Sequence, residues 1–277
     1  MDSKAAVVVD RVRMCYNMPT ERVDNIKEYV VRLLKGKLHY SEFVALDDVS
    51  ITINKGETVG IIGLNGSGKS TLLKLISGIL KPNKGTVEIN GVISPLIELG
   101  AGFDFELTTK ENIFLNGSVL GFDHKFMKAK YDEILDFAEL RRYENVAIKN
   151  FSSGMVARLG FAIATIVKPD ILIVDEILGV GDALFQQKCE RRIAELMSGG
   201  TTVIIVSHTI EQIERLCNRV LWIDKGRTVM LGDTKTVCER YKNLSDAREA
   251  AALAEEAQLR AKREAERAEN AESANND

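Results

Sequence analysis

Residues 58–70 carry the stretch that decides the fold, Thr-Val-Gly-Ile-Ile-Gly-Leu-Asn-Gly-Ser-Gly-Lys-Ser. Its first five residues form a short β-branched run that is typical of a buried strand. A helix is expected to follow, from about Lys69 to Ile79. Glycines between the two elements let the backbone turn successive N–H groups inward. These glycines are Gly63, Gly66 and Gly68. A strand, a glycine-rich loop and a helix in this order predict a phosphate-binding loop at a helix N-terminus.

The end of this loop matches the pattern Gly-x-x-x-x-Gly-Lys-Ser, which predicts ATP and Mg²⁺ as ligands. Lys69 reaches the β- and γ-phosphates, the Ser70 hydroxyl coordinates Mg²⁺, and Thr71 contacts the α-phosphate. The predicted nucleotide-binding residues here are Gly63, Leu64, Asn65, Gly66, Ser67, Gly68, Lys69, Ser70 and Thr71.

Acidic residues end a second apolar run, Ile-Leu-Ile-Val-Asp-Glu at 171–176. Asp175, at the strand end, suits Mg²⁺ coordination through water. Glu176 points the other way and suits polarising an attacking water. His208 follows another predicted strand on the same carboxyl edge, where ligands of such folds collect. We expect Glu176 and His208 to be catalytic, with His208 contacting the γ-phosphate and orienting Glu176.

The remaining pattern alternates strands with helices, which predicts a parallel sheet with helices on its faces. An edge strand is expected at 5–16, and the segment 22–34 has the spacing of an amphipathic helix that either covers the surface or docks a partner. Further strands are expected at 46–53, 86–89, 171–174 and 203–206, helices over 110–150 and 154–167, and a hairpin from 221–224 and 228–231.

Bulk composition excludes several classes of protein. A formal net charge of -3 over 277 residues gives no sign of a polyanion-binding protein. The four cysteines contain no Cys-x-x-Cys pair, which predicts neither disulfides nor zinc and favours a reducing cytoplasm. No signal peptide is expected at the N-terminus. The longest uncharged apolar run, 159–167, is shorter than the ~20 residues that span a bilayer.

The segment Phe-Ser-Ser-Gly-Met at 151–155 lies about twenty residues before Asp175. Together with the phosphate loop, the acidic pair and His208, it resembles the ATPase subunit of an ABC transporter over residues 5 to about 242. The family's usual signature is Leu-Ser-Gly-Gly-Gln, so only Ser152 and Gly154 match positions that touch the γ-phosphate. We call residues 151–155 the signature segment.

The signature variant, followed by Arg-Leu-Gly-Phe at 158–161, resembles bacterial exporters of surface polysaccharide of the O-antigen, capsule and teichoic-acid types. Further stretches point the same way: 98–103, 107–112 with its Leu-Thr and Glu-Asn pairs, and 180–189. The resemblance implies an ATPase of the translocase class that exports such a glycan across the cytoplasmic membrane. It would act as a peripheral protein on the cytoplasmic face of the inner membrane.

The resemblance also implies a shared site. Ser152, Ser153 and Gly154 open a helix and offer N–H groups to an anion. In the family, two subunits pair head to tail, and each signature segment completes the other subunit's ATP site. Asp182 would lie at this interface. The implied partners are a second copy of the chain and a separate transmembrane permease that handles the lipid-linked polysaccharide, with no nucleic acid.

Two roles stay open. The family has a Gln that contacts Mg²⁺, and Glu98 stands in the corresponding region here, so Glu98 is a candidate metal ligand. The family also stacks an aromatic side chain on adenine. Tyr16 is our choice, and Tyr40 and Phe43 remain alternatives.

The expected fold class is α/β. It comprises a P-loop NTPase core with a parallel sheet, an antiparallel β edge region, and a helical subdomain that carries the signature. We expect the ATPase domain to span 1–242, with the helical subdomain at about 105–168. The Ala/Glu/Arg-rich tail, 243–277, is expected to be helical or disordered. It has no strand patterning, so no carbohydrate-binding β-sandwich is expected, and the membrane partner would recognise the glycan.

The sequence supports three other functions less well than polysaccharide export. A non-transport ABC ATPase acting on nucleic acid or the ribosome commonly carries coiled-coil insertions or a second fused unit, and this sequence has neither. A nucleotide-binding scaffold without turnover is disfavoured by Lys69, Asp175, Glu176 and His208. An importer ATPase is disfavoured by the signature variant and by the missing Gln.

Overall fold

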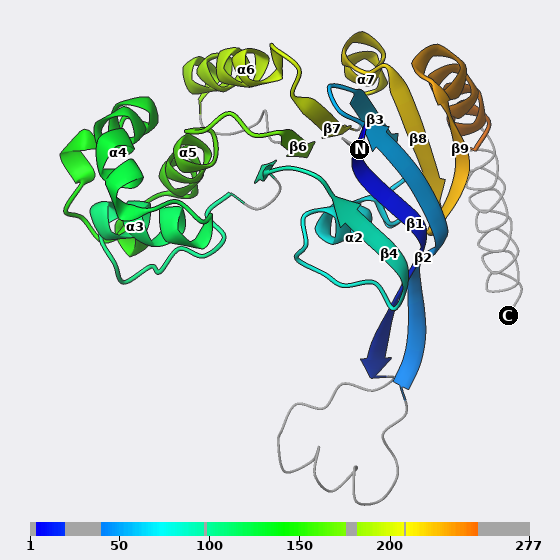
Figure 1. The fold of residues 1–277 in the computed structure, drawn as a ribbon, viewed down its shortest axis with the longest axis horizontal. Helices are drawn as coiled ribbons and strands as arrows, with labels where there is room; N and C mark the ends of the chain where they lie inside the picture. Colours follow the sequence, from blue (N-terminus) through cyan, green and yellow to red (C-terminus); the bar gives the residue numbers. More distant parts are fainter. Residues whose placement is uncertain (1–3, 20–39, 97–98, 176–181, 208, 249–277) are drawn as a thin grey trace, which may run out of the picture.

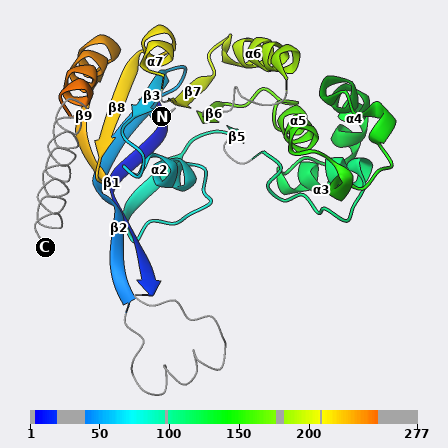
Figure 2. The ribbon, with the colours of Figure 1, turned by 180° about the vertical axis from the view of Figure 1, so that it is seen from behind.

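Two β-sheets and a set of helices make up the part of the chain that the computed structural model describes, residues 4–19, 40–96, 99–175, 182–207 and 209–248. Figures 1 and 2 show helices α3, α4 and α5 as a group at one side of the molecule. The two sheets lie at the other side, with α2 beside them.

The larger sheet has the strand order β5-β6-β7-β3-β8-β9. Its strands are β3 (Thr58–Ile62), β5 (Ile93–Leu96), β6 (Ile171–Asp175), β7 (Thr202–Val206), β8 (Arg219–Asp224) and β9 (Arg227–Asp233). The first five in spatial order pair in parallel, and β9 closes the sheet as an antiparallel hairpin with β8. The predicted parallel sheet and closing hairpin are therefore confirmed.

The smaller sheet is antiparallel, with the order β2-β1-β4. Its strands are β1 (Ala5–Pro19), β2 (Tyr40–Asn54) and β4 (Lys84–Ile89). The prediction that 5–16 is an edge strand is wrong, because β1 pairs with β2 on one side and with β4 on the other. Alternation of apolar residues reports which face of a strand is buried, and it carries no information on how many neighbours the strand has.

The helices are α2 (Lys69–Ile76), α3 (Thr109–Val119), α4 (His124–Ala138), α5 (Ser153–Ala164), α6 (Ala183–Met197) and α7 (Ile210–Leu216). Short 3-10 turns lie at Arg141–Tyr143 and Ile148–Asn150. A further helix covers 234–248. The expectation of mainly helical structure over 110–150 is confirmed. The predicted segment 22–34 and residues 249–277 of the tail lie outside the described residues.

Two helices end earlier than predicted. Helix α2 stops at Ile76 rather than Ile79, and Gly78 follows with a φ of 72° that interrupts helical geometry. Helix α5 stops at Ala164 rather than at Val167. The hydroxyl of Thr165 there donates to the carbonyl of Phe161 at 2.7 Å. Both differences leave the first turns of these helices, which carry the predicted ligand contacts, in place.

The central strands are buried on both faces. Ile171 and Ile173 of β6 join a core cluster that contains α2 and residues of both sheets. Leu172 and Val174 join a second cluster with α6, α7 and the helix at 234–248. A third cluster lies within α3, α4 and α5. This two-sided burial explains the continuous apolar runs in the sequence.

Among the described helices, none combines the length and the apolarity that crossing a bilayer requires.

Candidate functional site

The phosphate loop, residues 63–70, starts where β3 ends in the middle of the larger sheet. Strand β3 lies between β7 and β8, so the loop leaves the sheet among parallel neighbours. Helix α2 begins at Lys69, and its N-cap is Gly68 with φ 109° and ψ 0°. Since the first turn of a helix has N–H groups without intrahelical acceptors, this end of α2 favours an anion.

Two glycines of the loop are required by their surroundings. A Cβ atom on Gly63 would lie 2.2 Å from the carbonyl oxygen of Ile223. A Cβ atom on Gly68 would lie 2.7 Å from the carbonyl oxygen of Ala45. At Gly66, with φ 75°, nothing lies within 4 Å. The loop therefore packs against β2 and β8 at Gly68 and Gly63, while Gly66 is free on its outer side.

Lys69 is held over the loop. Its side chain is buried, and its Nζ donates to the carbonyl oxygens of Gly63 at 2.8 Å and of Leu64 at 2.9 Å. Beside it, Ser67 Oγ is buried and has no hydrogen-bond partner within the described ranges. A buried hydroxyl without a partner and a restrained ammonium group are polar groups that phosphate oxygens would satisfy. The loop thus fits the predicted ligand.

A turn from the β8–β9 hairpin supports the phosphate loop. The N–H of Gly226 donates to the carbonyl of Ser67 at 2.8 Å, and the carbonyl of Gly226 accepts from the N–H of Asp47 at 2.8 Å. Arg227 forms an ion pair with the same Asp47. The sequence pattern predicts only the hairpin of 221–224 and 228–231, in whose turn Gly226 lies. Its Lys-Gly-Arg pattern carries no signal of the contact with the distant loop.

The ends of β6 and β7, which precede the predicted catalytic residues, are aligned with the end of β3, which precedes the phosphate loop. Ile61 of β3 pairs with Val206 of β7, which pairs with Asp175 of β6. One strand, β7, therefore separates Asp175 from the residues that precede the phosphate loop, and Asp175 lies at the same carboxyl edge of the sheet. Glu176, His208 and Glu98 lie outside the described residues.

The candidates for adenine stacking lie together on the antiparallel sheet. Tyr16 of β1 and Phe43 of β2 are directly opposite each other. Tyr16 is partly buried and packs against the core cluster, whereas the side chain of Phe43 is 51% exposed. Tyr40 pairs with Pro19 at the far end of the ladder, and its side chain lies outside the description. The structure therefore places Tyr16 and Phe43 at one level of the β1–β2 ladder, with Phe43 the more exposed of the two.

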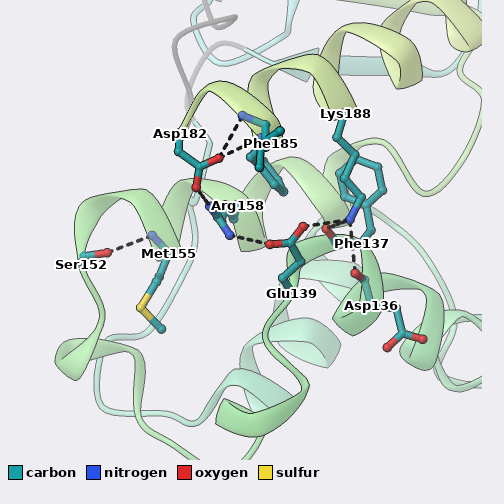
Figure 3. A network of polar contacts seen from close by, with 10 residues as sticks. Asp136, Phe137, Glu139, Ser152, Met155, Arg158, Asp182, Phe185 and Lys188 are labelled. Carbon is teal, nitrogen blue, oxygen red and sulfur yellow. Dashed lines mark hydrogen bonds and ion pairs between the residues drawn. The ribbon is translucent and has the colours of Figure 1, made fainter.

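The signature segment opens helix α5. Ser152 is the N-cap, and its Oγ accepts from the N–H of Met155 at 3.3 Å. Ser153 and Gly154 lie in the first turn of α5, whose N–H groups have no intrahelical acceptor, so this helix end favours an anion. Figure 3 shows this helix end close to Arg158 and Asp182. Residues 152–155 of the signature segment, with Glu139, Arg158 and Asp182, line one pocket of about 850 Å³.

Asp182 is the N-cap of α6. Its Oδ1 accepts from the N–H groups of Leu184 at 3.1 Å and of Phe185 at 3.0 Å. Its Oδ2 accepts from Nη2 of Arg158 on α5. The Phe185 N–H and the Arg158 guanidinium hold the pKa of Asp182 below its ordinary value, so the carboxylate is ionised at neutral pH. Arg158 follows the signature segment closely, but no local sequence pattern indicates its contact with Asp182.

The two halves of the candidate site lie on separate parts of the chain. Helix α2, which follows the phosphate loop, lies beside the sheets, and α5, which follows the signature segment, lies in the helical group. The two helices are apart in both views of Figures 1 and 2.

Comparisons with known proteins agree with this geometry. A family model described as ABC transporter matches residues 46–179. The O-antigen export system ATP-binding protein RfbB of Klebsiella pneumoniae is 44% identical over 211 residues, which cover 76% of this chain and 84% of that protein. The teichoic acids export ATP-binding protein TagH of Lactiplantibacillus plantarum is 40% identical over 245 residues, which cover 88% of this chain and 66% of that protein.

A solved structure, the ATP-binding cassette MJ0796 as a dimer in a post-hydrolysis state with ADP and Pi, matches with a TM-score of 0.63. It is 24% identical, and the match covers 82% of this chain and 98% of the cassette. The structure titled as the ATP binding subunit of an ABC transporter matches with a TM-score of 0.66 at 23% identity, covering 86% and 93% of the two chains. These likenesses show a common fold.

Proposed function

Because the chain belongs to the ABC transporter family, as a subunit that binds and hydrolyses ATP, we propose that it powers the export of a surface polysaccharide across the cytoplasmic membrane. The observation that carries this proposal is the 44% identity to a protein named for O-antigen export, together with 40% identity to one named for teichoic acid export. Neither relative is named for work on nucleic acid or the ribosome, so that alternative gains no support.

We assign the phosphate-binding role to residues 63–71, with Lys69 reaching the β- and γ-phosphates. The buried ammonium of Lys69 and the restrained glycines support this assignment. Ser70 and Asp175 would hold Mg²⁺, with Glu98 as a further candidate ligand. Mg²⁺ would neutralise charge on the phosphates. Glu176 would act as general base toward the attacking water, and His208 would orient it.

We assign the second half of each ATP site to the signature segment of another copy of this chain. Helices α2 and α5 lie apart in one chain, which supports a site closed between two subunits. The solved cassette of like fold is titled as a dimer. Closure would place the N-terminus of α5 against the γ-phosphate, where its N–H groups and the Ser152 hydroxyl stabilise negative charge.

A separate membrane permease would then carry the glycan, lipid-linked and recognised by that partner, while this chain acts from the cytoplasmic face. We assign residues 1–242 to the ATPase domain and 105–168 to its helical subdomain, which α3, α4 and α5 support. Residues 243–277 are assigned to the tail. Its first part, 243–248, continues the helix that begins at 234, so the change in composition does not coincide with a helix end.

The proposal is tested in the host by removing the chain and restoring it. We expect loss of surface polysaccharide and accumulation of the polymer inside the cell. The native chain should restore export, and the Lys69→Ala chain, produced at the same level, should not. Surface polysaccharide that stays normal without the chain would contradict the proposal.

A further inference from the structure

Glu139 adopts a backbone conformation that its residue type disfavours. It ends helix α4 with φ 62° and ψ 33°, in the left-handed region. That position after a helix is usually occupied by glycine, because a Cβ atom is strained there. Backbone conformations of this kind persist where the surrounding structure holds them, and they cluster at functional sites.

The carboxylate of Glu139 contacts two other helices. Its Oε2 accepts from Nη1 of Arg158 on α5 at 2.9 Å, and its Oε1 lies 3.3 Å from Nζ of Lys188 on α6. Lys188 Nζ also donates to the carbonyl of Phe137 at 2.8 Å, near the end of α4. The strained residue therefore joins α4, α5 and α6 (Figure 3).

Arg158 uses both arms of its guanidinium. Nη1 binds Glu139, and Nη2 binds Asp182, the N-cap of α6. The guanidinium carbon lies 4.6 Å from the centre of the Phe185 ring, and the N–H of that same Phe185 is capped by Asp182. The side chain of Arg158 is only 18% exposed. Its two carboxylate partners are more exposed, Glu139 at 53% and Asp182 at 63%. A planar fork that contacts two carboxylates and an aromatic face on separate elements is restricted in how it can turn.

We propose that Glu139 is a positioning residue, which locks Arg158 so that the signature segment and the Asp182 cap are presented to the second subunit as one rigid unit. The proposal rests on the proposed dimeric ATP site. Ser152 opens α5 six residues before Arg158. The side chains of Ser152, Arg158 and Asp182 line the same pocket. Without Glu139, Arg158 would keep Asp182 as a partner but lose the contact that fixes its direction.

The chain offers variants that separate positioning from mere stability. Glu139→Gly removes the carboxylate and relieves the strained backbone, whereas Glu139→Ala removes it and keeps the strain. Arg158→Lys keeps the charge but cannot place one planar fork on two carboxylates. Arg141→Gln is the matched control, because Arg141 also forms ion pairs with two carboxylates, those of Asp132 and Asp136, within the helical group.

The first readout is amide hydrogen exchange of the full chain without nucleotide, at Leu184 and Phe185. We expect faster exchange of both amides in Glu139→Gly, Glu139→Ala and Arg158→Lys, and no change in Arg141→Gln. Unchanged exchange in both Glu139 variants would overturn the proposal. This readout needs neither ATP nor a dimer, so it stands apart from a failure of the proposed function.

The second readout is ATP-induced dimerisation of the full chain in a Glu176→Gln background. The ATP concentration for half-maximal dimerisation should rise about tenfold in both Glu139 variants, a size typical of residues coupled in one ion-pair network. ATP affinity of the single chain should not change. Glu139→Gly should unfold at a higher temperature than Glu139→Ala and yet dimerise equally poorly. Dimerisation that follows thermal stability instead would show a merely structural role and overturn the proposal.

Discussion

The guanidinium of Arg158, on the helix opened by the signature segment, donates to the carboxylate of Asp182, which caps the first turn of α6. The N-terminus of α5 carries the signature segment, which we assign to the ATP site of the neighbouring subunit. Asp182 comes shortly after strand β6, which ends at Asp175. This ion pair therefore ties the helix of the signature segment to the first turn of α6.

Ionisation of Asp182 should contribute to the pH dependence of stability. The N–H of Phe185, with Arg158, lowers the pKa of Asp182 from the ordinary value of 3.8. Because the pKa in the folded chain is the lower one, the contribution is fully present above pH 3.8 and is lost as pH falls through the folded value. Urea unfolding at a series of pH values should show that Asp182→Asn flattens this acid decline. An identical decline in both chains would contradict the assigned cap.

Two glycines of the phosphate loop should respond differently to alanine. Gly68→Ala places a Cβ atom 2.7 Å from the carbonyl oxygen of Ala45, in a backbone with φ 109°. In Gly66→Ala the added Cβ atom has no neighbouring atom within 4 Å, so the positive φ of 75° is the only source of strain. We expect a loss of about 1 kcal/mol for Gly66→Ala, the cost of the left-handed backbone. Gly68→Ala should lose more than about 2 kcal/mol, because the backbone must also shift.

Chemical denaturation of the two variants, measured side by side, checks this difference. Equal losses would mean that the packing of the loop against β2 is wrong.

Adenine stacking should depend on Tyr16. A base stacked on an aromatic side chain contributes about 1–3 kcal/mol, so Tyr16→Ala should weaken ATP binding by that amount. Tyr16→Phe keeps the ring and is the control. Phe43→Ala tests the residue opposite, whose more exposed ring is the alternative stacking surface. Titration calorimetry with ATP and with inorganic triphosphate separates the adenine contribution, and an equal loss for both ligands would exclude Tyr16 as the stacking residue.

Alkylation should distinguish the four thiols, all of which are free. Burial raises the pKa of Cys189 and of Cys217 to about 12, and the pKa of Cys238 to about 11. Since the thiolate is the reactive form, these thiols should be inert in the folded chain at neutral pH. Cys15 is only partly buried and should react alone. Iodoacetamide labelling with mass spectrometry checks this, and a label on Cys217 in folded protein would contradict the packing.

Local patterns made much of the fold predictable. The β-branched run before Gly63 and the turn at Gly226 determine their elements within a few residues. The sequence pattern does not predict strand β5, because Pro95 within it weakens a strand pattern. The central place of β1 depends on pairing with β2 and β4, which no local pattern encodes.

In the candidate site, too, local patterns predict some residues, and contacts between distant residues determine the others. The phosphate loop and Asp175 follow from spacing along one strand and one helix. Glu139 and Arg158 are 19 residues apart, and Arg158 and Asp182 are 24 apart, so no helical or strand period relates them. The sequence does not show that Glu139 ends α4 in a left-handed conformation, because that follows only from its backbone angles.

The most direct test of the shared ATP site mixes two inactive chains. Lys69→Ala disables the phosphate loop. Gly154→Asp disables the signature segment by setting a negative charge against the phosphate, yet a Cβ atom there lies 3.8 Å from Ser152 Oγ and fits. A mixed dimer would hold one site built from an intact loop and an intact signature segment.

ATP hydrolysis is measured for each chain alone and for mixtures at several ratios. The account predicts almost no hydrolysis by either chain alone and recovered hydrolysis in the mixtures, greatest near equal amounts. Mixtures that stay inactive at every ratio, although both chains are folded, would contradict a site shared between two subunits.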